Sequence, residues 1–387
     1  MNGIWYYIIA FFAIWIIALI FKKRLEKHGV TIEFPILLWK TQRFTGFIDK
    51  IGKSHPKFWK YFMNLGSIIA YISMAIVTVT IIYSLFLIKG TSAVSVVLPG
   101  VEVPGSPIFI PFLSGIIALA SIIIVHEFAH GIVARAENIK VKSIGLALFA
   151  ILPGAFVEPD EEQMKQAKKS SRIRLAAAGS ISNYILAIIS LLLVLGISAY
   201  AMPGVYEVDG MEVQSIVNNS PADGILTKGV IINSIDNVKL NSAESYLSTF
   251  EHTHPNQTVT INTSKGNYNV KLAANPDNKS RGYLGITASP NNIINPSVEK
   301  QYGDILPWIW SWLGELFYIM FLLNLSVALF NLLPIKPLDG GIMLHNLLSY
   351  KLKEETCDDI LTFISVFIWL IIIGMLIYGM VTGLNLI

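Results

Sequence analysis

Charge is scarce in this 387-residue chain, and its scarcity excludes most classes of soluble protein. Only 14% of the residues are charged, whereas soluble domains average about 25%. Cysteine is nearly absent as well, and the single Cys357 excludes both a disulfide framework and a zinc site built from cysteines. The net charge of +3 is too small and too scattered to indicate nucleic-acid binding, so we expect no nucleic-acid partner.

The missing charges leave six uncharged runs along the chain. Each run has about the 18 or more apolar residues that a membrane-spanning helix requires. The runs are Ile4–Phe21, Leu65–Ile88, Val103–Val125, Leu175–Tyr206, Leu316–Ile335 and Ile360–Ile387. The sequence therefore predicts a membrane-embedded all-α bundle of about six transmembrane helices. Basic residues follow the first run instead of preceding it, so we interpret that run as a retained anchor and not as a signal peptide.

The placement of Lys and Arg predicts the orientation of the chain in a cell membrane. Between Lys22 and Lys60 there are ten Lys and Arg residues against three acidic residues. Because basic loops stay in the cytoplasm, this loop is predicted to be cytoplasmic and the N-terminus external. The six runs make the protein multi-pass, and the same rule puts the segment 203–304 on the external side.

One apolar segment, Ser143–Val157, is too short to cross a bilayer. Pro153 and Gly154 lie near its end. It predicts a re-entrant or β-hairpin segment, since non-helical backbone at membrane depth is tolerated only where protein or a wet cavity surrounds it. The alternative is a hydrophobic surface loop or an interfacial helix.

The segment 203–304 has the composition of a soluble domain, with many Asn and Ser residues. Val230–Ile235 and Thr258–Thr263 have the residue types of strands, and Glu244–Phe250 those of a short helix. We therefore expect a small β-rich domain inserted between two membrane spans.

The pattern that carries chemistry is HExxH, at His126, Glu127 and His130. Residues at i and i+4 share one helix face, so both imidazoles can reach one zinc ion, and Glu127 can take a proton from a zinc-activated water. The motif ends an apolar run, where each ionisable side chain costs about 2.5–3.5 kcal/mol on insertion scales. The alternative is a pair of hydrogen-bonded or hydrated histidines at the membrane edge.

A catalytic zinc site needs a third protein ligand. The residues left open for that role are a carboxylate in an apolar setting or one of His28, His55, His252, His254 and His345. Asp339 is the best candidate, because it follows an apolar run and a segment that Pro334 and Pro337 keep from being helical. A lone Asp in this setting is also a common helix cap. Glu315, directly before the run Leu316–Ile335, is expected to reach the interface or to pair with a neighbouring helix.

These residues resemble the signatures of the site-2 protease family of intramembrane zinc metalloproteases. The likeness rests on HEFAH at 126–130 and NLLPIKPLDG at 331–340, with GAFVEP at 154–159 and AAAGSISN at 176–183 between them. It extends from Ile110 to Leu348. An inserted domain before the LDG segment is also a family feature, and SPADG at 220–224 with KGVIINSI at 228–235 resembles the opening hairpin of a PDZ domain.

The resemblance implies a role for each matching position. His126, His130 and Asp339 would bind one Zn²⁺ per chain, and Glu127 would be the general base. Asn183 and Asn331 would hold the substrate backbone or the oxyanion, although an interhelical hydrogen bond is an equally good reading of each. The segment of Gly154, Ala155, Phe156 and Val157 would add to an unwound substrate as a strand edge.

The predicted function is hydrolysis of peptide bonds within transmembrane segments, at a site toward the cytoplasmic side. The expected partners are the lipid bilayer and single-pass membrane proteins that another protease has already trimmed. Five regions are expected: a two-helix membrane region with the basic loop (1–107), two parts of the catalytic core (108–202 and 305–348), the PDZ-like domain (203–304) and a last transmembrane helix (349–387). Two alternatives stay open: a non-enzymatic transporter or peptide receptor, and a membrane-anchored HExxH protease that acts outside the bilayer.

Overall fold

The computed structural model describes residues 3–86 and 94–384, and the predicted run ends at Ile88 and Ile387 lie outside that range. The chain forms two compact units. The helical unit comprises Met1–Val194 and Glu315–Ile387, and the β-rich unit comprises Leu195–Gly314. The β-rich unit contains the segment 203–304, whose composition predicts a soluble domain.

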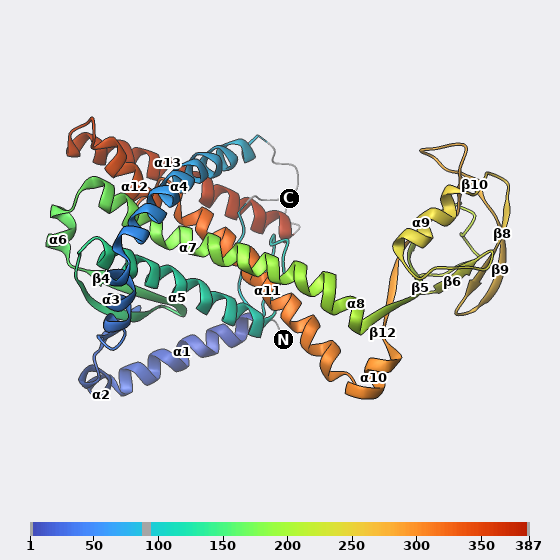
Figure 1. Ribbon diagram of the computed structural model, residues 1–387, viewed down its shortest axis with the longest axis horizontal. Coiled ribbons are helices and arrows are strands. Elements are labelled where there is room, and N and C mark those ends of the chain that lie inside the picture. Colours follow the sequence, from blue (N-terminus) through green and yellow to red (C-terminus); the bar gives the residue numbers. More distant parts are fainter. Residues whose placement is uncertain (1–2, 87–93, 385–387) are drawn as a thin grey trace. The chain divides into compact units, whose positions relative to one another are not determined.

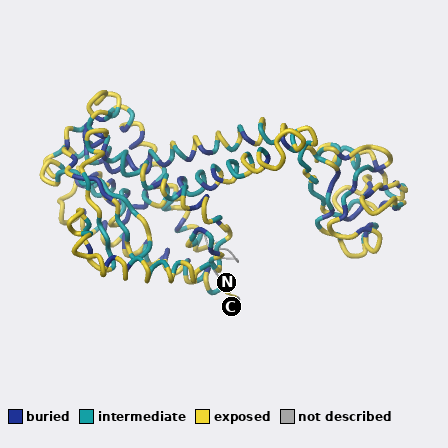
Figure 2. The backbone as a smooth tube through the Cα atoms, turned by 90° about the horizontal axis from the view of Figure 1, so that it is seen from below, coloured by how far each residue is buried: buried dark blue, intermediate teal, exposed yellow. Residues whose placement is uncertain are grey.

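Among the described residues, five helices are long and apolar enough to cross a membrane. They are α4 (Pro56–Ser84), α5 (Phe112–Ala136), α7 (Lys169–Gly196) with its continuation through η1 (Ile197–Ala201) and α8 (Met202–Val205), α11 (Ile305–Asn331) and α13 (Glu354–Gly383). The remaining predicted span forms α1 (Ile4–Ile20), an apolar helix of 17 residues. Figure 2 shows exposed residues along these helices, as expected where lipid is the surrounding solvent.

The third uncharged run, Val103–Val125, is not helical from its first residue. The run begins at Val103, but α5 begins only at Phe112. Pro104, Pro107 and Pro111 explain the difference, since each lacks an N–H and Pro111 is the residue that caps the helix start.

A four-stranded antiparallel sheet belongs to the helical unit (Figure 1). Its strands, in sheet order, are β1 (Val30–Glu33), β2 (Ile36–Thr41), β3 (Val141–Phe149) and β4 (Leu152–Pro159). The β3–β4 hairpin confirms the β-hairpin predicted over Ser143–Val157. The strands β1 and β2 are not predicted from the sequence, because the basic residues between Lys22 and Lys60 indicate only the orientation of the chain. That segment instead forms α2 (Lys22–Lys27), β1, β2 and α3 (Thr45–Ser54).

The strand β4 is an edge of this sheet, and α5 packs beside it. Gly131 of α5 is the point of close approach. A Cβ at this position would lie 2.7 Å from Ile48 of α3 and 3.4 Å from Val157 of β4. The missing side chain therefore brings the HExxH helix against the hairpin.

The core of the helical unit is built around the start of α7. Ala176, Ala177 and Ala178 are buried there, together with Met343 of α12 (Asp339–Leu348). Small side chains let helix backbones approach closely, which is how helices associate in a membrane, where hydrophobic burial contributes little. The short α6 (Glu161–Gln166) connects β4 to α7.

The β-rich unit is built on a six-stranded antiparallel sheet, which confirms the predicted small β-rich domain. In order along the path the strands are β12 (Ile286–Ile294), β5 (Tyr206–Ile216), β6 (Ile231–Ile235), β8 (Thr258–Thr263) and β9 (Gly266–Lys271), with β7 (Val238–Lys239) paired to β6. The other elements are α9 (Ala243–Glu251), β10 (Ala273–Ala274), β11 (Gly282–Tyr283) and α10 (Pro296–Tyr302). Alternate residues of β8 are buried and exposed, so one face of the sheet covers the core.

Candidate metal centre

The two histidines of the HExxH motif lie one above the other on α5. Their Nε2 atoms are 3.1 Å apart and their ring centroids 4.8 Å apart. Both side chains are largely buried, with exposed fractions of 12% and 16%. The spacing i, i+4 on a helix therefore produces the convergence that the sequence predicts.

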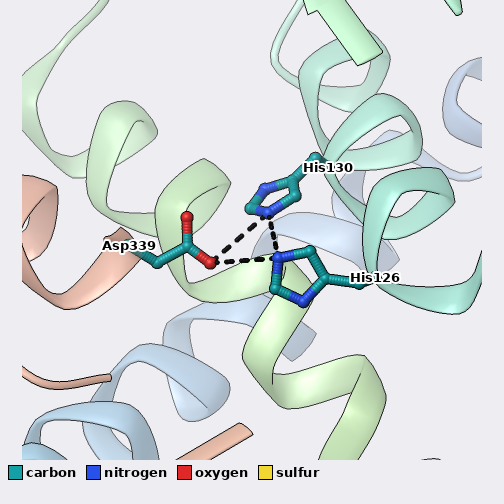
Figure 3. Close-up of side chains that lie close together, drawn as sticks. All are labelled: His126, His130 and Asp339. Atoms are coloured by element: carbon teal, nitrogen blue, oxygen red, sulfur yellow. Dashed lines mark hydrogen bonds and ion pairs between the residues drawn. The ribbon is translucent and has the colours of Figure 1, made fainter. Parts of the chain in front are cut away.

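Asp339 reaches the same point from a different part of the chain (Figure 3). Its Oδ2 atom lies 3.4 Å from the Nε2 atom of His126 and 3.4 Å from that of His130. Asp339 begins α12, which follows the end of α11 at Asn331. Gly340 makes this turn possible, because a Cβ there would lie 2.3 Å from the carbonyl oxygens of Leu332 and Leu333.

The three side chains fit a zinc ion. The three ligand atoms lie within 4.8 Å of one another. Four ligands at about 2.0–2.1 Å in a tetrahedron are about 3.3 Å apart, which is close to the observed separations. Two ring nitrogens and a carboxylate oxygen held at this spacing present lone pairs to one another, an arrangement that a cation between them stabilises. Within the described residues, the buried Oδ2 atom of Asp339 has no hydrogen-bond partner of its own.

The charge state of Asp339 suits a metal ligand. Burial raises the pKa of the Asp339 carboxyl, but the neighbouring imidazoles of His130 and His126 outweigh burial and hold that pKa below its ordinary value. A carboxylate must be ionised to bind a metal, and positive charge beside Asp339, on the imidazoles or on a metal ion in their place, favours that form.

Gly179 of α7 forms the wall beneath the two imidazoles. A Cβ at this position would lie 2.4 Å from Cε1 and Nε2 of His126 and 2.5 Å from Nε2 of His130. No real Cβ atom tolerates such distances. The AAAGSISN segment at 176–183 therefore has a physical basis: its Gly179 makes room for the ligand rings.

The outer nitrogen of each ring has a partner on α7. His130 Nδ1 lies 2.8 Å from the carbonyl oxygen of Leu175, and His126 Nδ1 lies 3.2 Å from Nδ2 of Asn183. Asn183 is fully buried, and its Oδ1 atom lacks a hydrogen-bond partner among the described residues. Rotating that amide by 180° would place the oxygen against His126 Nδ1, where it would accept the proton of a ring bound to metal through Nε2.

Glu127 is held by the hairpin. The backbone N–H of Val157, on β4, donates a hydrogen bond of 3.0 Å to Glu127 Oε2. The carboxylate is also within electrostatic reach of His126, His130 and Asp339. Residue types alone do not predict this contact, because any residue except proline can supply a backbone donor.

The other predicted positions are placed as follows. Gly154, Ala155 and Phe156 lie with Val157 on the edge strand β4, and Asn331 is the half-buried last residue of α11. Their contact with a substrate stays a prediction. Two further residues lie outside the triad of His126, His130 and Asp339. His345 Nε2 lies 3.8 Å from Asp358. Glu315 accepts a 2.6 Å hydrogen bond from Ser114 of α5, which is the pairing with a neighbouring helix expected for it.

The chain is similar to known proteins over most of its length. The family model described as peptidase family M50 matches residues 114–372. A protein of Methanocaldococcus jannaschii, described as uncharacterized protein MJ0971, is 32% identical over 350 residues, which cover 86% of this chain and 87% of that protein. The membrane-bound transcription factor site-2 protease homolog of Arabidopsis thaliana is 24% identical over 213 residues, or 54% of this chain and 41% of that protein.

Solved structures similar to this chain are PDZ domains of Listeria proteins. The PDZ domain of the SdrC-like protein Lmo2051 of Listeria monocytogenes is 27% identical, with a TM-score of 0.19, and covers 21% of this chain and 87% of that domain. The corresponding domain of Lin2157 of Listeria innocua is 26% identical, with a TM-score of 0.19, and covers 21% of this chain and 93% of that domain.

Proposed function

This chain belongs to peptidase family M50, the metallopeptidase family of the site-2 proteases, and from that premise we propose that it hydrolyses peptide bonds within membrane-spanning segments of other proteins. The observation that carries the proposal is the meeting of His126, His130 and Asp339 around one point. Two of these residues lie on α5, a helix long and apolar enough to span a membrane. An ionisable cluster on such a helix is costly and marks a functional site.

The proposed cofactor is one Zn²⁺ per chain, held by His126 Nε2, His130 Nε2 and Asp339 Oδ2. Three protein ligands with a fourth position open are typical of catalytic zinc. When bound, zinc supplies Lewis acidity toward a carbonyl oxygen and makes water more acidic. The carbonyl oxygen of Leu175 and the amide of Asn183 orient the two rings, so both act as positioning groups.

Glu127 performs the proton transfers in this proposal. Its carboxylate takes a proton from the attacking water and delivers it to the nitrogen of the leaving amine as the peptide bond breaks. The N–H of Val157 fixes one carboxylate oxygen, and in this proposal the other oxygen holds the proton. This division of the two oxygens suits a group that must act first as base and then as acid.

The substrate segment is proposed to bind along β4. A transmembrane helix hides its own carbonyl groups, so it must unwind before hydrolysis, and an unwound segment needs new hydrogen-bond partners in lipid. The edge strand β4 offers a backbone edge beside the proposed catalytic residues. Addition of the segment as a strand would supply partners for its backbone hydrogen-bonding groups and place it beside the triad.

We propose that the substrates are single-pass membrane proteins already trimmed by another protease. The support is the distribution of charge: the basic loop between Lys22 and Lys60 is assigned to the cytoplasm, which puts the β-rich unit outside and the triad toward the cytoplasmic face. An external unit of this kind would bind or screen the short remaining ectodomain. Cleavage would then release the cytoplasmic part.

The test uses the detergent-purified chain with a synthetic single-pass peptide. We expect cleavage within its apolar segment, and we expect both a zinc chelator and Glu127→Gln to abolish it. Cleavage only in soluble flanking residues would support the alternative of a protease that acts outside the bilayer. That alternative also requires a third ligand from an extramembrane domain, whereas Asp339 of the helical unit lies beside both histidines. Family membership disfavours the transporter alternative.

A further inference from the structure

The hydrogen bond from Val157 to Glu127 shows which edge of β4 each backbone group faces. In an antiparallel ladder, the N–H and C=O groups of one residue point to one side and those of the next residue to the other. The N–H of Val157 is donated to Glu127, so it points away from β3. By alternation, residues 153, 155 and 157 face the free edge, and residues 154 and 156 face β3.

Two further observations agree with this assignment. Pro153 has no N–H to donate, and proline is found in sheets where the missing donor faces a free edge. The N–H of Asp160, an even-numbered residue, donates a 2.7 Å hydrogen bond to Lys140, which precedes β3. The pairing from Ser143 with Glu158 to Phe149 with Leu152 has no register shift, so the alternation is unbroken between them.

The free edge of β4 is therefore short of donors. Three carbonyl groups face outward, at Pro153, Ala155 and Val157. Only Ala155 has an N–H available on this side, because Pro153 lacks one and that of Val157 is occupied by Glu127. A segment that binds here can accept one hydrogen bond, from the N–H of Ala155. It can donate up to three, to the carbonyl groups of Pro153, Ala155 and Val157.

We propose that this edge sets the cleavage register. The inference rests on the proposed function. In a complete ladder, one substrate carbonyl would accept a hydrogen bond from the N–H of Val157. Here that N–H donates to Glu127, so the carbonyl faces the carboxylate of Glu127. That carbonyl is left without a backbone partner, beside the triad, and is the one hydrolysed. The substrate N–H groups that bond to β4 recur at every second residue, whichever direction the segment runs.

The chemical class of substrate follows from these donors and acceptors. It is an extended segment with backbone N–H groups at alternate positions on both sides of the scissile bond. Proline or an N-methylated residue is excluded at those positions and accepted between them. A helix-breaking effect alone would not alternate, so the period of two separates strand addition from simple unwinding.

The substrate-side experiment is an N-methyl scan of a synthetic peptide with about 20 apolar residues that the wild-type chain cleaves. Binding of each peptide is measured to the Glu127→Gln variant, whose side-chain oxygen can still accept from Val157. We expect affinity to fall roughly tenfold at alternate positions and to change little between them. Equal losses at all positions, no losses, or a helical period would overturn the register while leaving the proposed protease activity intact. Failure of the wild-type chain to cleave any peptide would instead contradict the proposed function.

The enzyme-side experiment compares Ala155→Pro with Ala155→Ser. The proline removes the outward N–H and no hydrogen bond of the ladder with β3, so the sheet and the zinc content should persist while KM rises roughly 2- to 10-fold and kcat changes little. Ala155→Ser retains the N–H and should raise KM less than Ala155→Pro does. An unchanged KM in Ala155→Pro contradicts the proposal, and so does loss of zinc or of folded protein, because either would mean that this N–H belongs to the ladder with β3.

Discussion

The Nδ1 atom of His126 lies 3.2 Å from the side-chain amide of Asn183, so α7 holds a ring that α5 supplies. His130 is held in the same way by the carbonyl of Leu175, about two turns before Asn183 on that helix. Since α7 also contains Gly179, a single helix shapes and orients both histidines of the centre.

Asn183→Ala is expected to weaken zinc binding. The ring of His126 would lose the partner that fixes its orientation, and loss of such outer partners typically reduces metal affinity 10- to 100-fold. Competition with a chromophoric chelator measures this directly. Asn183→Asp keeps an acceptor and should retain more affinity than the alanine variant. Equal, wild-type affinity in both variants would show that Asn183 does not orient the ring.

Gly179→Ala is expected to destroy the centre. Its Cβ would lie 2.4 Å from the His126 ring, so either the ring or α7 must move and the three ligand atoms would separate. The measurement is zinc content per chain after purification. Gly196→Ala is the matched control on the same helix, because nothing lies within 4 Å of a Cβ at that position. Full zinc content in Gly179→Ala would refute the described packing.

Glu127→Gln is expected to retain zinc and lose hydrolysis. The amide cannot take a proton from water, and positioned acid–base catalysis contributes roughly 100- to 10,000-fold in rate. The two readouts are zinc content and cleavage of a single-pass peptide. Residual activity within a few-fold of wild type would remove Glu127 from its proposed role.

Acid is expected to destabilise the chain through Glu137, which follows α5. Burial raises the pKa of its carboxyl, but hydrogen bonds of 2.7 Å from Arg174 and from Ser171, with the charge of Lys60, outweigh burial and hold that pKa below its ordinary value. A depressed pKa means that this stabilisation is complete above the unfolded pKa of about 4.3 and is lost as pH falls through the folded pKa.

The thermal midpoint between pH 7 and pH 3 checks this expectation. Glu137→Gln should lower the midpoint at pH 7 and reduce the fall toward pH 3, and the exposed Glu354→Gln should do neither. Identical pH profiles for wild type and Glu137→Gln would show that the Arg174 contact contributes nothing.

The centre was predictable from sequence because its chemistry is local. His126 and His130 are four residues apart on one helix, and Asp339 stands in a second recognisable motif. The β3–β4 hairpin was also predictable, since an apolar segment too short to span the membrane has few alternatives. These signals depend on residue type and spacing alone.

The rest depends on pairings between distant segments. Trp39 pairs with Leu146 across the sheet, and nothing in the basic composition around β2 indicates that partner. The bond from Val157 to Glu127 uses a backbone donor, so no side chain reports it. The role of Gly179 likewise appears only when α7 is placed against α5.

Zinc content tests the central claim most directly. The detergent-purified wild-type chain should contain about one zinc per chain, and Asp339→Ala should lose it, because two imidazoles without the carboxylate leave a catalytic site one ligand short. Asp358→Ala, which removes an exposed carboxylate paired with Lys336, should keep the zinc. A wild-type chain that binds no zinc, or an Asp339→Ala variant that binds it as tightly as wild type, would contradict the account.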